Sequence, residues 1–459
     1  MSDLDTIVAI ATPPGTGGVA IVRMSGTRSR EIAQAMVRTG GGHPVAPALT
    51  ERTEKVLLVG VLIDPVSGRR LDEAVILVFV GPRSYTTEDV VEFQIHAGPA
   101  TIERVLTACL ACGARLATRG EFTRRAYLGG RLDLTRAEAV LELAQARTDR
   151  ALDAALNQLD GHLARFTNAL REPIRHLLAE IEASIDFPDE LDVPPSARIL
   201  ATLEELRDRI QGLLAEVPAA RLVREGARVA LLGLPNVGKS SLLNALIASD
   251  RAIVTEHAGT TRDVLEETWT VHGIPCRILD TAGIRQEEVD PVERLGIARS
   301  EQALREAELR LVVMDGTRTV DPSFEELLER ARAHGPTVLV VNKGDLESWR
   351  SPAGEADAIR VSARTGEGLE HLTTAVWREL TSGTVTLVPS VAINARHEAA
   401  LTRACEALCQ ARQACQDSLP VDLVAHDLRM ALELLGTVQG EALTEEVIDH
   451  IFERFCVGK

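Results

Sequence analysis

Apolar residues near the start of the chain form short runs that are separated by turn residues. These runs include TIVAIATPPG, GVAIVRMSG, VLLVGVLID, EAVILVFV and DVVEFQIHAG, and the second is followed by a helical stretch, REIAQAMVR. Short runs rich in Val and Ile, bounded by Gly, Pro or Asp, are typical of strands. The pattern therefore predicts an α+β domain over residues 1–118.

The spacing of apolar positions changes further along. From about residue 134 to 216 they recur at helical intervals, as in TRAEAVLELAQARTDRALDAALNQLDGHLARFTNALR. Strands and helices then alternate from ARVALLGL to GLEHLTTAVWREL, which is typical of a doubly wound sheet. After VPSV the chain returns to helices. We expect one discontinuous helical domain, residues 119–223 and 383–459, with an α/β domain at 224–382 inserted into it; two separate helical domains are the alternative.

The net charge, the apolar runs and the cysteines indicate which class of protein this is. The chain has 459 residues, a net charge of −17, no apolar run long enough to span a membrane and seven scattered cysteines. The N-terminus lacks the basic segment of a secretory signal, so we expect a protein of the reducing cytosol. Cys109 and Cys112 have no second pair at zinc-finger spacing, and we expect buried thiols there rather than a metal.

The negative net charge argues against a protein that coats nucleic acid without specificity. A local basic stretch nevertheless exists. Its side chains could either form a solvated face or contact phosphates. It contains Arg115, Arg119, Arg124, Arg125, Arg131 and Arg136.

A phosphate-binding loop is indicated by ARVALLGLPNVGKSSLLNAL, which reads as a buried strand, a glycine-rich loop and the start of a helix. Gly233, Gly238, Lys239 and Ser240 fit the pattern G-x-x-x-x-G-K-S. In such loops backbone N–H groups and a helix N-terminus surround phosphate oxygens. We expect Lys239 to bridge the β- and γ-phosphates and the Ser240 hydroxyl to bind magnesium.

The sequence NKGD, from Asn342 to Asp345, follows the apolar strand PTVLVV and indicates the base. The carboxylate of Asp345 can accept two hydrogen bonds from guanine, from the ring N–H and from the exocyclic amine. Adenine offers no such pair of donors, so it would leave the acceptor unpaired. The segment VSARTG places Ser362, Ala363 and Arg364 where a loop would lie against the guanine oxygen.

Two further segments indicate a response to the γ-phosphate. DTAG, residues 280–283, ends the strand PCRILD and supplies an outer carboxylate for magnesium and a backbone amide for the γ-phosphate. AGTTRD places Thr260 and Thr261 on a loop, and Thr261 is the expected second hydroxyl ligand of magnesium. We expect that loop to be ordered while the γ-phosphate is present.

The residue after Gly283 departs from many small GTPases, which carry a water-orienting Gln there. It is Ile284 in this chain, and an apolar side chain cannot orient water. Another group must do so, and the segment RQEEVDPVE, residues 285–293, offers several acids. Arg262 and Arg285 are candidates for an arginine finger.

Taken together, these motifs resemble the bacterial MnmE family of tRNA-modification GTPases, also called TrmE. The resemblance rests on GLPNVGKSS, AGTTRD, DTAGIR with VERLGI, the N-terminal TPPGTGGVAIVRMSG and the C-terminal FCVGK, so it runs through the whole chain. It implies an α+β folate-binding N-terminal domain, a discontinuous helical domain and an inserted P-loop, Ras-like G domain.

The resemblance also implies partners and cofactors. It implies a homodimer formed through the N-terminal domains, and a heterotetramer with a flavin-dependent subunit similar to MnmG. Together they would modify the wobble uridine of tRNA at carbon five with a one-carbon unit from 5-formyltetrahydrofolate or 5,10-methylenetetrahydrofolate. GTP, magnesium and potassium would act in the G domain, whose copies would pair across the dimer.

Several site residues are implied by the same resemblance. Asn236 would bind potassium through its side chain, and Thr255, His257 and Thr260 would complete that site through backbone groups. Glu293 would position the attacking water. The whole set expected to bind the nucleotide is Asn236, Val237, Gly238, Lys239, Ser240, Ser241, Thr255, Glu256, His257, Ala258, Gly259, Thr260, Thr261, Asp280, Thr281, Ala282, Gly283, Asn342, Lys343, Asp345, Ser362, Ala363 and Arg364.

The implied folate site consists of Arg23, Glu92, Arg131 and the terminal Lys459. Arg131 stands where the family has Lys, which keeps the charge but changes the geometry. Cys456 matches a near-terminal catalytic cysteine and lies three residues before Lys459, a spacing of about one helical turn.

Two other functions compete with this interpretation. A ribosome-assembly GTPase without one-carbon chemistry would carry an appended RNA-binding domain, whereas this chain ends in helices and FCVGK. A GTP-binding scaffold without turnover is disfavoured by the complete magnesium and γ-phosphate motifs.

Overall fold

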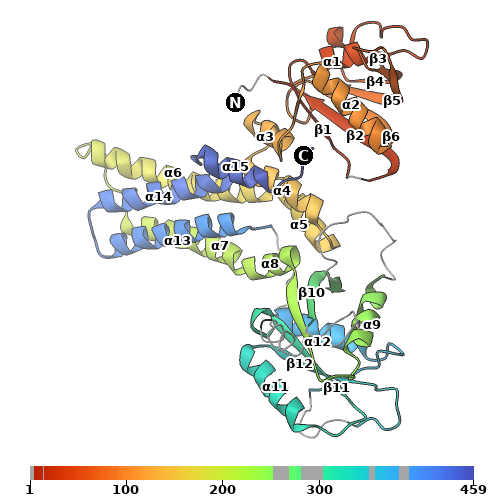
Figure 1. Cartoon of the computed structure of the whole chain (residues 1–459). Helices are drawn as coiled ribbons and strands as arrows, with labels where there is room; N and C mark the ends of the chain where they lie inside the picture. Colours follow the sequence, from red (N-terminus) through yellow and green to blue (C-terminus); the bar gives the residue numbers. More distant parts are fainter. Residues whose placement is uncertain are drawn as a thin grey trace. The chain divides into compact units, whose positions relative to one another are not determined.

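The computed structural model describes residues 5–13, 15–251, 268–280, 302, 304–350, 357–381 and 392–459 (Figure 1). The chain divides into two compact units, which we describe separately. The first contains residues 1–141, 158–208 and 399–459, and the second contains residues 142–157 and 209–398. Among the described residues, no helix is both long and apolar enough to cross a membrane.

The first unit contains a seven-stranded sheet with the strand order β3-β4-β5-β6-β2-β1-β7. Neighbouring strands are antiparallel except for β1 and β7, which are parallel. One face of the sheet packs against α1 and α2 around Met36, Phe93 and Val105. The bounds are β1 Ile7–Ile10, β2 Gly17–Ser25, α1 Ser29–Met36, β3 Val37–Arg38, β4 Val56–Ile63, β5 Arg70–Phe79, β6 Val90–Ala97, α2 Pro99–Ala111 and β7 Arg115–Leu116.

The helices of the first unit come from distant parts of the sequence. α6 packs along α14, and the side chain of Arg171 donates hydrogen bonds to Glu441 beyond the end of α14. Because both helices carry one apolar face, burial of those faces accounts for the pairing. The bounds are α3 Glu121–Leu128, α4 Leu134–Gln145, α6 His162–Asp186, α7 Ser196–Ala215, α13 Ala395–Gln416, α14 Val421–Gln439 and α15 Glu445–Glu453.

The C-terminal tail returns to the sheet of the first unit. Phe452 and Phe455 are buried against Leu134 of α4, and Val457 forms an isolated β-bridge with Arg119. Gly458 has a φ of +94°, and a Cβ there would lie 2.1 Å from the carbonyl oxygen of Ile10. This close contact places the last residues beside β1, and only glycine fits so near that backbone.

The second unit has a six-stranded sheet with the order β13-β12-β11-β8-β10-β9, in which all neighbours are parallel except β9 and β10. Apolar clusters cover both faces, one including α9 and α12 and the other α11. The predicted doubly wound sheet is confirmed, with β9 as an antiparallel edge. The bounds are α5 Asp149–Leu159, α8 Val217–Glu225, β8 Ala227–Leu232, α9 Lys239–Arg251, β9 Thr268–Val271, β10 Ile274–Asp280, β11 Leu309–Asp315, α11 Pro322–His334, β12 Thr337–Asn342, β13 Ile359–Arg360 and α12 Leu369–Thr381.

Candidate functional site

The loop between β8 and α9 has the conformation that its glycines permit. Gly233 has a φ of +150°, and Gly238 a φ of +94°. A Cβ at Gly238 would lie 2.4 Å from Nδ2 of Asn342, and one at Gly233 would lie 2.4 Å from the carbonyl oxygen of Val313. The loop can therefore close only where these side chains are missing, as a phosphate-binding loop requires.

Lys239, at the start of α9, donates hydrogen bonds from Nζ to the carbonyl oxygens of Gly233, at 2.9 Å, and Leu234, at 3.0 Å. Its ammonium group therefore spans the mouth of the loop. Ser240 and Ser241 follow in the first turn of the helix, where N–H groups lack helical partners. A cation, hydroxyls and the positive end of a helix together favour a polyphosphate with a bound metal ion.

Asn342 joins the loop to the segments expected to bind the base. It is 2 % exposed, its Nδ2 donates to the carbonyl oxygen of Val237 at 3.0 Å, and its Oδ1 accepts from the backbone N–H of Ala363 at 3.1 Å. One buried amide thus connects the phosphate loop, NKGD and VSARTG. The structure brings these three predicted segments together.

Asp345 is held by two neighbours from the VSARTG segment. Its carboxylate accepts from the Ser362 hydroxyl at 2.8 Å and pairs with the Arg364 guanidinium at 2.7 Å. The hydrogen bond from Ser362, with the charge of Arg364, holds the pKa of Asp345 below its usual range. The group therefore stays ionised, as an acceptor for two N–H donors must be.

Asp315, at the end of β11, was not identified from the sequence. Its Oδ2 lies 2.6 Å from Nζ of Lys343, and Thr317 donates to its other oxygen. Burial opposes ionisation of Asp315, but the hydrogen bonds from Lys343 and Thr317 outweigh it and lower its pKa. The carboxylate of Asp315 positions Lys343, the lysine of NKGD. In the sequence, the only sign of this role was that Asp315 ends a buried strand next to β12.

Some predicted residues lie outside the described part of the chain. They comprise the two γ-phosphate segments, the potassium loop and the proposed water-positioning acid. The side chain of Asp280 is not described either. The residues are Thr255, Glu256, His257, Ala258, Gly259, Thr260, Thr261, Arg262, Thr281, Ala282, Gly283, Ile284, Arg285 and Glu293.

A second group of predicted residues meets in the first unit. Arg23 and Glu92 are paired across β2 and β6, and Nε of Arg23 donates to Oε1 of Glu92 at 2.7 Å. Nη1 of Arg23 lies 3.5 Å from the carbonyl oxygen of Gly458, so the tail carries Lys459 to the same place. Cys456, two residues before Gly458, is exposed. The tail is not helical here, because α15 ends at Glu453, but the backbone N–H of Lys459 donates to the carbonyl oxygen of Cys456 at 3.4 Å, so one non-helical turn separates the two residues.

Arg131 joins this group through Tyr85, which the sequence analysis missed. Nη1 of Arg131 donates to the carbonyl oxygen of Tyr85 at 2.9 Å, and its guanidinium carbon lies 4.8 Å from the centre of the Tyr85 ring. Arg23 lies 5.7 Å from the same centre. Tyr85 could not be recognised from the sequence, because a single aromatic residue between two strands belongs to no binding motif.

The basic stretch is mostly committed to internal contacts. Arg125 is largely buried and pairs with Asp5, Glu88 and Glu121, while Arg115 also pairs with Asp5 and Glu121. Burial opposes ionisation of Glu121, yet hydrogen bonds from Arg115, Thr118 and Arg125 lower its pKa to about 2. These two arginines therefore belong to a structural ion-pair cluster rather than a phosphate-binding face.

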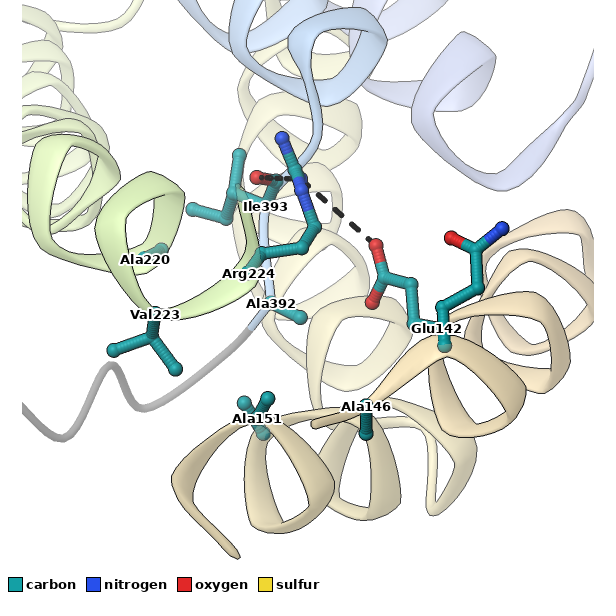
Figure 2. Close-up of a pocket in the computed structure, with 10 residues that line it drawn as sticks. Glu142, Ala146, Ala151, Ala220, Val223, Arg224, Ala392 and Ile393 are labelled. Carbon is teal, nitrogen blue, oxygen red and sulfur yellow. Dashed lines mark hydrogen bonds and ion pairs between the residues drawn. The ribbon is translucent and has the colours of Figure 1, made fainter. Parts of the chain in front are cut away.

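A small cavity lies in the second unit, beside the chain segments that enter and leave its six-stranded sheet. Figure 2 shows Arg224 between Glu142 and Ile393: its Nη1 donates to the carbonyl oxygen of Ile393 at 2.7 Å, and the carboxylate of Glu142 is 3.8 Å away. Alanines, including Ala146 and Ala220, form much of the wall. The volume of about 40 Å³ suits only a few waters, not a cofactor.

Comparison with known proteins finds matches along nearly the whole chain. The family model described as the MnmE helical domain matches residues 134–456, and the one described as the GTP-binding protein TrmE N-terminus matches residues 6–131. A relative from Heliobacterium modesticaldum, called tRNA modification GTPase MnmE, is 44 % identical over 99 % of both chains. Relatives of the same description from Moorella thermoacetica and Geobacillus thermodenitrificans are 44 % and 42 % identical, over 99 % and 100 % of each chain.

Among solved structures, Era bound to MgGDPNP and a fragment of 16S ribosomal RNA aligns with 39 % of this chain and 66 % of its own, at 26 % identity. The TM-score is 0.26, so this likeness carries no structural argument.

Proposed function

Because this chain belongs to the MnmE family of tRNA modification GTPases, we propose that it uses GTP hydrolysis to drive modification of the wobble uridine at carbon five. The one-carbon unit comes from a tetrahydrofolate, and a flavin-dependent subunit similar to MnmG completes the catalytic complex. The observation that carries this proposal is the meeting of Arg23, Glu92 and the C-terminal tail on a unit separate from the GTP site.

The donor set suits a reduced folate. The pterin edge presents paired N–H donors, which the carboxylate of Glu92 can accept, and the glutamyl group carries carboxylates that Arg131 and Lys459 can bind. The side chain of Glu92 is only 13 % exposed, so its position on β6 is well fixed. When bound, the folate supplies the one-carbon unit, and Cys456, exposed on the tail, is the thiol proposed to act there.

Magnesium and potassium belong to the GTP site in this proposal. Ser240 and Thr261 hold magnesium, while Asn236 with Thr255, His257 and Thr260 holds potassium against the phosphates. Asn236 has a φ of +64°, a left-handed backbone conformation that is uncommon for residues other than glycine, and it lies within the phosphate-binding loop. A monovalent cation there would supply the positive charge that an arginine finger supplies elsewhere. Glu293 positions the water, since Ile284 cannot.

The proposed homodimer has a suitable surface on the sheet of the first unit. Leu57 and Val59 of β4 and Val19 of β2 are 68 %, 62 % and 60 % exposed. They share one face, because Val59 pairs with Val75, which pairs with Gln94, and His96 two residues later pairs with Val19. Val19 and Val59 also line one shallow groove, and exposed apolar side chains that gather on one face are typical of an interface. Val59→Lys should yield monomers in analytical ultracentrifugation.

Calorimetric titration of the purified protein with 5-formyltetrahydrofolate tests the folate proposal. Glu92→Ala should weaken binding by about 1–3 kcal/mol, because the donors that it pairs would lose their acceptor. Absence of binding to the intact protein would favour a ribosome-assembly GTPase instead.

The potassium proposal is tested by GTP turnover in potassium and sodium salts. Turnover should be much faster in potassium, and Asn236→Ala should remove the difference. Equal turnover of the wild-type protein in the two salts would refute a potassium site.

A further inference from the structure

We infer that Tyr85 is a positioning residue of the proposed folate site: its ring fixes the guanidinium groups of Arg131 and Arg23 and so directs Arg131 toward a ligand carboxylate. The inference rests on the proposed function. It concerns a residue on the loop between β5 and β6 that carries no charge and that the motif analysis did not identify.

The ring of Tyr85 lies beside both arginines, and Arg23 also lies 5.7 Å from the centre of the Phe122 ring. The guanidinium carbon of Arg131 lies 4.8 Å from the ring centre and that of Arg23 lies 5.7 Å from it. Attraction between a cation and an aromatic face operates within about 6 Å. The backbone of Tyr85 adds a second contact to one of them, since its carbonyl oxygen accepts from Nη1 of Arg131 at 2.9 Å.

Tyr85 is itself well held. Its hydroxyl lies 3.0 Å from the Thr123 hydroxyl on α3, and Thr123 is fully buried. Its ring packs against the buried cluster that includes Ile7 and Phe122. On the next residue of the loop, the Thr86 hydroxyl is 2.6 Å from that of Ser25 on β2. The ring is therefore tied to the sheet and to α3 at once.

The two arginines differ in their remaining charge. Arg23 is neutralised by Glu92 at 2.7 Å, whereas Arg131 is exposed and has no carboxylate partner among the residues that the structure describes. An aromatic face orders a guanidinium without cancelling its charge. Tyr85 thus keeps Arg131 available for a ligand anion, and the glutamyl carboxylate of a folate is the group that we assign to it.

The arrangement depends on residue 131 being an arginine. A guanidinium is planar, can lie over a ring and can still present a pair of N–H donors to a carboxylate. A lysine ammonium is a compact charge on a flexible stem and has no plane to align. Arg131→Lys should therefore weaken binding even though the charge is retained.

A double-mutant cycle tests the inference, with 5-formyltetrahydrofolate as the probe and calorimetry on the full chain. Tyr85→Leu should raise the Kd about tenfold, the scale of a lost cation–π contact and the order that it imposed. In an Arg131→Leu background the same change should raise the Kd less than about twofold, because the residue through which Tyr85 acts is gone. Tyr85→Phe keeps the ring and should restore affinity to within about twofold of the wild type.

The matched control is Phe79→Leu. Phe79 also has a cation over its ring, with Nζ of Lys55 at 5.6 Å from the centre, but it lies outside the proposed site. It should leave the Kd unchanged. If Tyr85→Leu does not fold, as judged by its melting curve, Tyr85→Met takes its place in the cycle.

Two results would overturn the inference alone: a wild-type Kd in the Tyr85→Leu variant, or an equal loss in both backgrounds, which would indicate a purely structural role. If the wild-type chain binds no folate, the proposed function fails as well. The wild-type titration therefore separates the two failures.

Discussion

Asp345→Asn is the substitution that tests recognition of the base most sharply. The carboxylate is 11 % exposed and is fixed by Ser362 at 2.8 Å and Arg364 at 2.7 Å. These contacts keep it ionised and hold it between NKGD and VSARTG, the segments proposed to bind the base. The amide has the same shape, so the change alters the hydrogen-bonding groups and leaves the packing intact.

The expected loss follows from the number of hydrogen bonds. Guanine offers two N–H donors to the carboxylate, and bonds to a charged acceptor contribute about 1.5–3 kcal/mol each. The amide presents one donor of its own toward guanine's exocyclic amine, so both bonds are weakened or lost. GTP affinity should therefore fall by about 10²-fold to 10⁴-fold. Xanthine carries an oxygen in place of that amine, so XTP should bind the variant better than GTP does.

Equilibrium titration with fluorescent GTP and XTP analogues measures both affinities. Asp321→Asn is the matched control, because it makes the same chemical change in the same unit at the N-cap of α11, where the carboxylate accepts from the Ser323 N–H at 2.8 Å. It should leave both affinities unchanged. A variant at Asp345 that keeps wild-type GTP affinity, with no gain for XTP, would refute the proposed base contact.

Three further predictions follow from particular contacts. Gly238→Ala places a methyl group 2.4 Å from Nδ2 of Asn342, so GTP affinity should fall at least about tenfold in the same titration. The folded-state pKa of Glu121, about 2, lies below its ordinary 4.5, so ionised Glu121 contributes about 3 kcal/mol to the free energy of unfolding above pH 4.5, and this contribution is lost as the pH falls toward 2. Urea unfolding at a series of pH values should show the loss, and the Glu121→Gln variant should lack this pH dependence. Arg224→Ala removes the bond to the carbonyl of Ile393, and should lower tRNA modification while GTP affinity, measured in parallel, is retained.

Much of the fold and of the GTP site could be predicted from the sequence because the signals are local. Each strand of the second unit carries its own apolar run, and the glycines of the phosphate loop are required by their own φ angles. The motif order also indicated that the phosphate loop, NKGD and VSARTG belong to one site, but the bridge that Asn342 makes between Val237 and Ala363 was not predicted. The predicted parallel sheet lacked only the antiparallel edge strand β9.

The remainder depends on contacts between residues far apart in sequence. Tyr85 is recognisable only when Arg131, 46 positions later, is placed over its ring. The contact between Arg23 and Gly458 spans 435 positions. Cys456 and Lys459 were expected to lie about one helical turn apart, but α15 ends at Glu453, and Phe452 and Phe455 are buried where the last residues run beside β1. Such tertiary contacts leave no periodic pattern in the sequence.

Reconstitution tests the central claim most directly. The purified chain is combined with a flavin-dependent MnmG-like subunit, unmodified tRNA, 5,10-methylenetetrahydrofolate, an amine donor that captures the transferred carbon, GTP, magnesium and potassium, and the wobble nucleoside is identified by mass spectrometry. We predict a uridine modified at carbon five that disappears when the folate is omitted or when Lys239→Ala replaces the wild type. Full modification without folate, or with the Lys239→Ala variant, would contradict the coupling of GTP hydrolysis to one-carbon transfer.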